Sequence, residues 1–434
     1  MSRVRSFTTG TLGVLLLATL IRSGWLAADW ASLTADPDAY WQLGENLAQC
    51  GTLGFRRQGE SEIRPTAYRP PLYPLLIAMA TRLGENRSLL AALHLALGVA
   101  ACLWIYGAAR RWLSTGWAAL AALMVAVDPL LLRHSSLVMT ETLAAALVAA
   151  VLYVESVVQE PASWRKPLVQ GLLIGLLALC RPVFLLFAIV YAATPRTLES
   201  STGNAWRRML VFAVAFVLVL TPWLARNRWH WQVWIPGTTH GGYTLWLANN
   251  PSFYAYLDEG DWGEIWLPEK SVARLHISER RKAADIQFLH QRDRLLQLAE
   301  HDEPLADRQA YDLAWQAIQS HPDQILYACL TRVGRFWQLA PHRTAATESN
   351  SATAMRYGIG VGYGILFALA SIGIFASRRQ SPAFPWHVVL SLLASMMLVH
   401  AFYWTNMRMR APLEPAVALL AALGLERVWA TIRQ

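Results

Sequence analysis

The chain has 434 residues, of which 55% are hydrophobic and 15% are charged, and its net charge is +9. A single soluble core of this length would not bury so much apolar surface, so most of that surface must face lipid. The basic residues form short clusters between apolar runs and gather on no single face or tail, which excludes a nucleic-acid-binding surface. The four cysteines have neither the spacing of a disulfide framework nor that of a zinc site.

Apolar runs long enough to cross a bilayer recur along the chain, where a helix needs about 20 apolar residues. We therefore predict an all-α polytopic membrane protein with about ten transmembrane helices. The expected spans are residues 9–28, 89–109, 117–132, 141–158, 168–180, 183–193, 209–225, 358–376, 386–403 and 412–431. The runs 168–180 and 183–193 are short, and one element bent at Arg181-Pro182 is an alternative.

Lysine and arginine residues beside these runs indicate the orientation. With the N-terminus in the cytoplasm, the cytoplasmic connections carry the positive charge that the positive-inside rule expects. These connections are Arg110-Arg111, Arg165-Lys166, residues 196–208, Arg378-Arg379 and the tail with Arg427 and Arg433. Arg3 and Arg5 also fit a cleaved signal peptide. Because the first run is long enough to span and more spans follow, we expect an uncleaved helix.

This orientation leaves two large polar segments outside. The first, residues 29–88, belongs to an N-terminal membrane module of residues 1–225, and its stretch 71–83 is too short and too proline-bounded to span, so we predict an interfacial helix. The second, residues 226–356, is expected to form a small external helical domain with helices around 278–300 and 307–320. Residues 357–434 return to the membrane.

Two carboxylates directly follow the first span. Asp36 and Asp38 precede an amphipathic stretch that begins near Tyr40. Carboxylates at the outer membrane face can provide a general base beside a lipid-borne substrate. Aspartate is also a favoured helix N-cap, so either residue could instead cap the helix that starts near Ala39. The spacing does not decide between these roles.

Six short tracts along the chain resemble those of a known family. They are Asp36 with Tyr40 and Leu43, Arg69-Pro70-Pro71-Leu72-Tyr73-Pro74-Leu75, Met139-Thr140-Glu141-Thr142-Leu143, Thr221-Pro222-Trp223 with Arg226-Asn227, Gly241-Gly242-Tyr243 with Leu245-Trp246 and Asn249-Asn250-Pro251, and Arg408 with Arg410 and Pro412. In this order they resemble the bacterial family-39 type glycosyltransferases of the GT-C superfamily. These are relatives of protein O-mannosyltransferases and of the aminoarabinose transferases that modify lipid A.

The resemblance implies a GT-C fold and an inverting glycosyltransferase that moves a sugar from a polyprenyl-phosphate carrier to a glycan, lipid or protein acceptor at the external membrane face. It implies that the first external loop supplies the catalytic base, at the position of Asp36, with Tyr40 as a substrate-binding residue. Asp38 is the second acidic residue of this loop. The family subtype further implies the cell inner membrane, with the active site facing the periplasm or exterior.

Other charged residues lie at predicted outer helix ends. Glu141 either is favoured there by the helix dipole or, as the resemblance implies, positions the acceptor or Arg69. Arginine binds phosphate bidentately, which suits an anionic carrier, although snorkelling at the interface is the alternative for each arginine. Arg69 and Arg181 are candidates, and we expect Arg408 and Arg410, which match a family tract, to bind the lipid phosphate.

Trp246, Asn249 and Asn250 match the family's external tract, where they are expected to contact sugar or to shape a turn before Pro251. The histidines show no metal-ligand spacing, so we predict no metal site and no cofactor, while the resemblance leaves a divalent metal open. The sequence contains no P-loop, Rossmann fingerprint or nucleophile elbow, which disfavours a cytosolic nucleotide-sugar enzyme.

A transporter or flippase of lipid-linked sugars is the main alternative from another class. Transporters tend to have repeated halves and charged or broken helices near the bilayer midplane, whereas the acidic residues here gather at one face. A glycan polymerase or ligase would share that face but use another acceptor, and a membrane scaffold would have no activity. An Asp36→Asn variant, expected to lose activity but not membrane insertion, distinguishes an enzyme from the others.

Overall fold

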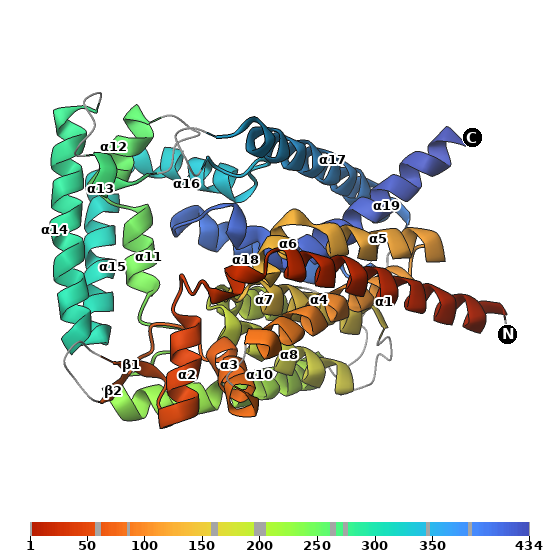
Figure 1. The fold of residues 1–434 in the computed structure, drawn as a ribbon, viewed down its shortest axis with the longest axis horizontal. Coiled ribbons are helices and arrows are strands. Elements are labelled where there is room, and N and C mark those ends of the chain that lie inside the picture. Colours follow the sequence, from red (N-terminus) through yellow and green to blue (C-terminus); the bar gives the residue numbers. More distant parts are fainter. Residues whose placement is uncertain are drawn as a thin grey trace.

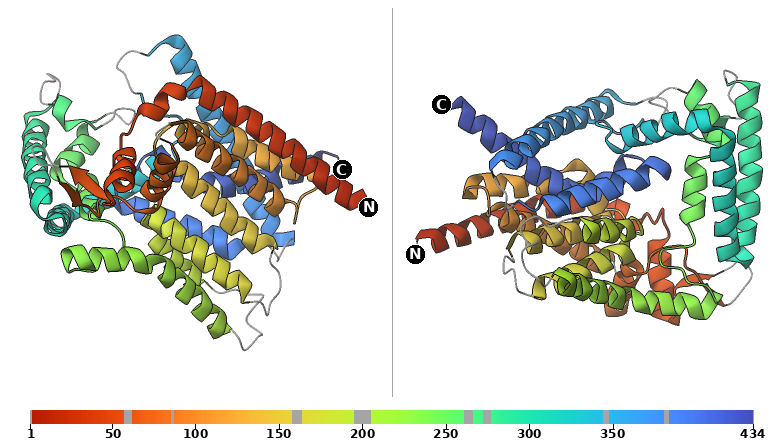
Figure 2. Two further views of the ribbon diagram at one scale, coloured as in Figure 1. Left: turned by 60° about the horizontal axis from the view of Figure 1, so that its bottom comes forward. Right: turned by 180° about the vertical axis from the view of Figure 1, so that it is seen from behind.

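The computed structural model describes residues 2–56, 62–84, 87–157, 164–194, 205–260, 266–271, 277–343, 348–380 and 384–433. Within these ranges the chain is almost entirely helical, and its strands form one short antiparallel pair. A bundle of long helices makes up most of the molecule, and helices α11–α16, which we call the polar layer, cover one end of it (Figure 1). Both chain termini lie at the opposite end of the bundle (Figures 1 and 2).

Each predicted apolar run lies in helical structure. The bundle helices are α1 (Ser2–Ala28), α4 (Arg87–Ala109), α5 (Thr115–Val127), α6 (Pro129–Ser135), α7 (Glu141–Val157), α8 (Arg165–Cys180), α9 (Val183–Ala193), α10 (Ala205–Trp231), α17 (Asn350–Gln380), α18 (Trp386–Phe402) and α19 (Glu414–Ile432). Residue 158 and residues 196–204 of the predicted connection 196–208 lie outside the described residues.

The membrane-spanning character of the bundle follows from helix length and composition. In the described part of the chain, five helices are long and apolar enough to cross a membrane, and the pair α5 and α6, bent by 51°, is a sixth if it counts as one span. The prediction of an all-α polytopic membrane protein is therefore confirmed. The expected number of about ten spans is larger, because helices such as α8 and α9 contain only 16 and 11 residues.

The run 168–193 is divided into two helices at Arg181. This residue has an extended backbone, with φ −149° and ψ 124°, between the end of α8 and the start of α9. Proline disfavours a helical conformation in the residue before it, so Pro182 explains the break. The break leaves the side chain of Arg181 at the junction of two helix ends.

The loop after α1 folds into small elements beside the bundle. They are the 3-10 helix η1 (Trp30–Thr34), α2 (Tyr40–Cys50), the strands β1 (Gly54–Arg56) and β2 (Ile63–Pro65), and α3 (Leu72–Leu83). Helix α3 matches the predicted interfacial helix, and its exposed residues Leu75, Met79 and Leu83 recur every fourth position, as on one helix face. A Cβ on Gly44 would lie 2.5 Å from a methyl carbon of Ile77, so α2 and α3 pack very closely.

The polar layer has its own apolar core. It consists of α11 (Gly241–Ala248), α12 (Pro251–Glu259), α13 (Pro268–Ser271), α14 (Glu279–His301), α15 (Glu303–Ser320) and α16 (Pro322–Phe336). Trp246 stacks on Phe288 at 4.5 Å in this core. Ser278 and Asp302 cap α14 and α15, so both helices predicted in this segment form.

Glu303 attaches the polar layer to the first loop. Its Oε2 accepts hydrogen bonds from the backbone N–H of Ala67 at 3.0 Å and from the hydroxyl of Thr239 at 2.8 Å. Ala67 precedes Arg69 in the same loop, and Glu303 is the first residue of α15. One carboxylate thereby joins two segments that are far apart in sequence.

Candidate active site

A cavity of about 740 Å³ opens between the polar layer and the ends of the bundle helices. Its wall is built from the loop after α1, the start of α7, the break between α8 and α9, the 3-10 helix η2 (Met407–Leu413) and the polar layer. The Asp, Glu and Arg residues in the wall are Asp38, Arg69, Glu141, Arg181, Asp307, Arg308 and Arg408.

The two carboxylates of the first loop point in different directions. Asp38 lies in the cavity wall, where Oδ1 accepts a hydrogen bond from Arg69 at 2.8 Å and Oδ2 accepts one from Arg408 at 3.1 Å. Asp36 is not among the lining residues, and its Oδ2 accepts from the backbone N–H of Gln42, in the first turn of α2, at 3.1 Å. Asp36 thus acts as a capping side chain does.

The backbone between the two carboxylates explains this difference. Ala39 has φ 60° and ψ 24°, a left-handed conformation that is uncommon for residues other than glycine. Its N–H donates to the carbonyl of Asp36 at 3.2 Å and closes a turn. The chain therefore reverses just before α2, which keeps Asp36 beside the helix start and turns Asp38 toward the cavity.

Five charged side chains form a continuous network in the cavity wall. Its sequence of contacts is Arg69, Asp38, Arg408, Glu141 and Arg181. Arg408 is the central bridge, because its Nη1 lies 3.1 Å from Asp38 and its Nε lies 3.4 Å from Glu141. Three guanidinium groups and two carboxylates leave one positive charge in excess. This excess of positive charge favours the binding of an anionic ligand.

Aromatic rings hold Arg69 in place. Its guanidinium carbon lies 4.8 Å from the ring centroid of Tyr68 and 5.6 Å from that of Tyr40, and its Nε donates to the backbone carbonyl of Asp38 at 3.1 Å. Tyr40 is buried and packs edge-on against Tyr73. Cation–π contacts of this kind orient an arginine whose rotamers would otherwise be free.

The other predicted arginine of η2 lies elsewhere. Arg410 is fully buried, with Nε 2.6 Å from Glu414 and Nη1 donating to the carbonyls of Phe336 and Gln338. It is not among the lining residues. The structure therefore brings Arg69, Arg181 and Arg408 together with Asp38 and Glu141 but leaves Arg410 in the protein interior.

The three side chains predicted from the external tract to bind substrate, Trp246, Asn249 and Asn250, also lie outside the cavity wall. Trp246 belongs to the core of the polar layer, and Asn249 donates to the carbonyls of Leu245 and Phe402. Asn250 accepts from the N–H of Phe253 at 2.8 Å and caps α12. Of the two roles considered for this tract, the side-chain contacts of Asn250 correspond to the turn before Pro251.

The polar-layer side of the cavity contains residues that sequence reasoning missed. Asp307, Arg308 and Tyr311 line it from α15, and the hydroxyl of Tyr311 lies 3.4 Å from that of Tyr403. Burial raises the pKa of Asp307 to about 6, against the opposing effect of the N–H of Gly242. Burial, aided by Arg69, lowers the pKa of His240 to about 3. The only sign of this pair in the sequence is the spacing of Asp307 and Tyr311, which are one helical turn apart and so lie on the same face of a helix.

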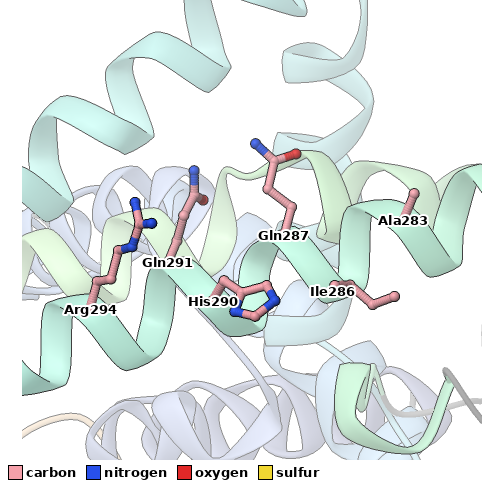
Figure 3. Close-up of a pocket in the computed structure, with 6 residues that line it drawn as sticks. All are labelled: Ala283, Ile286, Gln287, His290, Gln291 and Arg294. Atoms are coloured by element: carbon pink, nitrogen blue, oxygen red, sulfur yellow. The ribbon is translucent and has the colours of Figure 1, made fainter.

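A second hollow, of about 620 Å³, is a poor candidate for a catalytic site. Figure 3 shows that its six lining residues, Ala283, Ile286, Gln287, His290, Gln291 and Arg294, all project from α14. None of them is a carboxylate, and no second element contributes to the lining that is described. Chemistry at one centre normally requires groups that converge from several elements.

The charged residues of the cavity do not suit a metal ion. Among the described residues, no group of three or more His, Cys, Asp or Glu side chains is close enough to hold one. Asp38 and Glu141 are each bound to guanidinium groups instead.

The fold and the cavity define a class: a multi-pass helical membrane protein with a charged cavity at one end of its bundle. Residues 68–225 match the family described as dolichyl-phosphate-mannose-protein mannosyltransferase. Among curated proteins, no sequence matches the chain significantly.

Solved structures of an archaeal enzyme share this fold, and a bacterial enzyme is similar to a lesser degree. The oligosaccharyltransferase AglB of Archaeoglobus fulgidus in its apo form is 18% identical, with a TM-score of 0.52 over 97% of this chain and 51% of its own. The same enzyme with an inhibitory peptide and a dolichol-phosphate is 16% identical, with a TM-score of 0.52 over 97% of this chain and 50% of its own. ArnT of Cupriavidus metallidurans bound to undecaprenyl phosphate is 16% identical, with a TM-score of 0.43 over 94% of this chain and 77% of its own.

The chain spans about half the length of the archaeal enzyme. At these identities the likeness describes the fold, which is that of the GT-C glycosyltransferases. The resemblance predicted from the sequence tracts is confirmed by this fold and by the family match.

Proposed function

We propose that the protein is an inverting glycosyltransferase that moves a sugar from a polyprenyl-phosphate carrier to an acceptor. The observation that carries the proposal is the network of Asp38, Glu141 and three arginines in the wall of one cavity. A base and an excess of positive charge are what a displacement with an anionic leaving group requires. The family match of residues 68–225 and the carrier in the AglB complex support the same chemistry.

Asp38 is the base in this proposal. It takes the proton of the acceptor nucleophile, which attacks the anomeric carbon while the bond from that carbon to the carrier phosphate breaks. Each carboxylate oxygen has two lone pairs, so Asp38 can still accept a proton while it binds Arg69 and Arg408. The base and the acceptor proton must lie within about 2.6 to 3.2 Å of each other, directly or through one water.

Arg408 and Arg181 receive the leaving phosphate. The electron pair of the broken bond stays on the phosphate, whose charge is then balanced by guanidinium groups that remain protonated at any working pH. Glu141 contacts both arginines, at 3.4 Å and 3.2 Å, and holds them side by side. Glu141 is thus a positioning residue in this scheme, and the positive excess of the network is available to the carrier.

The proposed placement in the cell follows from charge. The arginine-rich connections predicted from the sequence would face the cytoplasm, at the end of the bundle that holds both termini, and the cavity would open to the periplasm or exterior of the inner membrane. The acceptor would be a glycan, a lipid or a protein that reaches this face. The polar layer then forms the side of the cavity from which the acceptor enters.

Lipid analysis of cells that lack the protein tests this function. We expect them to accumulate a polyprenyl-phosphate sugar, and we expect Asp36→Asn, a matched control, to restore the normal level. Asp38→Asn should reach the membrane but fail to restore it, because loss of a general base costs roughly 10²- to 10⁴-fold in rate. Full complementation by Asp38→Asn would refute its role as base. Accumulation confined to the cytoplasmic leaflet would favour a flippase instead.

A further inference from the structure

His400 is a buried imidazole in the wall of the same cavity. It lies in the last turn of α18, is only 6% exposed, and stacks on the ring of Phe336 at 5.2 Å. No step of the proposed transfer uses it. Its Nε2 is a buried polar atom with no hydrogen-bond partner among the described residues. Buried polar atoms in native proteins are nearly always paired, so an unpaired one in a cavity wall points to a ligand.

Thr405 determines which ring nitrogen of His400 carries the proton. Its Oγ1 lies 2.7 Å from Nδ1 of His400, and within the described part of the chain this hydroxyl has no other partner. The hydroxyl hydrogen is used only if Thr405 donates it to Nδ1. In that tautomer Nε2 bears the ring hydrogen and is a donor. His400 therefore presents an unused N–H, which requires an acceptor.

Arg181 provides a second donor beside His400. It lines the same cavity as His400, and its Nη2 donates to the sulfur of Met409 at 2.9 Å. A thioether is a weak acceptor. The Nε2–H of His400 and the guanidinium of Arg181 would both form stronger hydrogen bonds to an anionic oxygen, because charge-assisted hydrogen bonds are stronger than those to a neutral sulfur. A phosphate offers several such oxygens at once.

We propose that His400 binds the carrier phosphate through Nε2–H, next to Arg181, with Thr405 fixing the tautomer. The inference rests on the proposed function and adds a residue that the sequence tracts do not contain. The phosphate displaces Arg181 from the sulfur of Met409 and draws it toward the same oxygens. His400 is a binding residue here, and Thr405 is a positioning residue.

Two substitutions of His400 separate this role from packing. A glutamine places an amide N–H near the position of Nε2, whereas an asparagine reaches only the position of Nδ1. With undecaprenyl phosphate as the probe, we expect His400→Asn to bind roughly ten- to a hundredfold more weakly. The affinity of His400→Gln for undecaprenyl phosphate should lie within about threefold of that of the unaltered protein. Exposed His290, substituted by glutamine, is the control.

Undecaprenol, which lacks the phosphate, completes the test. We expect all variants to bind it equally, because the lost contact is to the phosphate. Unchanged undecaprenyl phosphate binding by His400→Asn overturns the inference and leaves the proposed function intact. An equal loss in the asparagine and glutamine variants also overturns it, since only packing would then explain the effect. Failure of the unaltered protein to bind undecaprenyl phosphate refutes both proposals.

Discussion

Asp38 and Arg408 are separated by 370 positions in the chain, and Oδ2 of Asp38 lies 3.1 Å from Nη1 of Arg408. The contact joins the loop after the first helix to the 3-10 helix that precedes the last one. Because Arg408 also reaches Glu141, it ties the proposed base to the proposed phosphate site. The geometry of both therefore depends on one guanidinium.

Replacing Arg408 by lysine should reduce kcat/KM for the lipid-linked sugar by roughly tenfold or more, because a charge-assisted hydrogen bond contributes about 1.5 to 3 kcal/mol. An ammonium group is a point charge and cannot reproduce the planar fork that reaches Asp38 and Glu141 together. Steady-state kinetics of the purified protein in nanodiscs provide the measurement. Kinetics equal to those of the unaltered protein would mean that the bridge has no catalytic role.

Replacing Arg410 should affect the stability of the fold and not the binding of the carrier. It is buried against Glu414, and removing one partner of a buried ion pair typically costs about 3 to 5 kcal/mol. We expect Arg410→Gln to lower the free energy of unfolding by an amount of this order and the melting temperature with it. Thermal unfolding in detergent, compared with Arg408→Lys, checks this. A stable Arg410→Gln protein that fails to bind undecaprenyl phosphate would show that Arg410 contacts the carrier after all.

Asp307 should make stability depend on pH. Burial raises its pKa from 3.8 to about 6, so the folded state holds this proton more tightly than the unfolded chain does. The resulting stabilisation is complete below about pH 3.8 and is lost as the pH rises through about 6. Asp307→Asn lacks this dependence, so its melting temperature should rise relative to that of the unaltered protein between pH 4 and pH 7. A constant difference over that range would contradict the assignment.

The proposed orientation can be tested with single cysteines. Cys50 is exposed and must first be replaced, for example by serine. A cysteine at exposed Gln309 of α15 should then react with an impermeant reagent added to intact cells. One at exposed Ser114, beside Arg110-Arg111, should react only after permeabilisation, because the positive connections are expected in the cytoplasm. Reaction of Ser114→Cys in intact cells would reverse the topology.

Helix positions were the part of this fold that the sequence predicted well. Apolar runs and lysine or arginine flanks depend on solvent and membrane physics, which act locally on each run. Thus α3 and the capped α14 and α15 formed where residue patterns placed helices. The bend at Arg181 was also visible, because Pro182 acts on the residue before it.

The site was harder to predict because it depends on backbone direction. Asp36 and Asp38 differ in orientation through the left-handed Ala39, which no periodic pattern reveals. Arg408 and Arg410 lie in η2, where residues two apart project roughly 240° apart at about three residues per turn. One faces the cavity and the other the interior. His400 carried no signal at all, since only its unpaired nitrogen distinguishes it from a core histidine.

The hydrogen bonds of Glu303 couple α15 mechanically to the loop that carries the proposed base. Glu303 holds the backbone of Ala67, and the guanidinium of Arg69, two residues further on, binds Asp38. Any displacement of α15 would therefore be transmitted through Ala67 to the arginine that binds the proposed base. Asp307 and Tyr311 line the cavity from the same helix. The position of the proposed base and the shape of the polar-layer side of the cavity are thus mechanically coupled through one carboxylate.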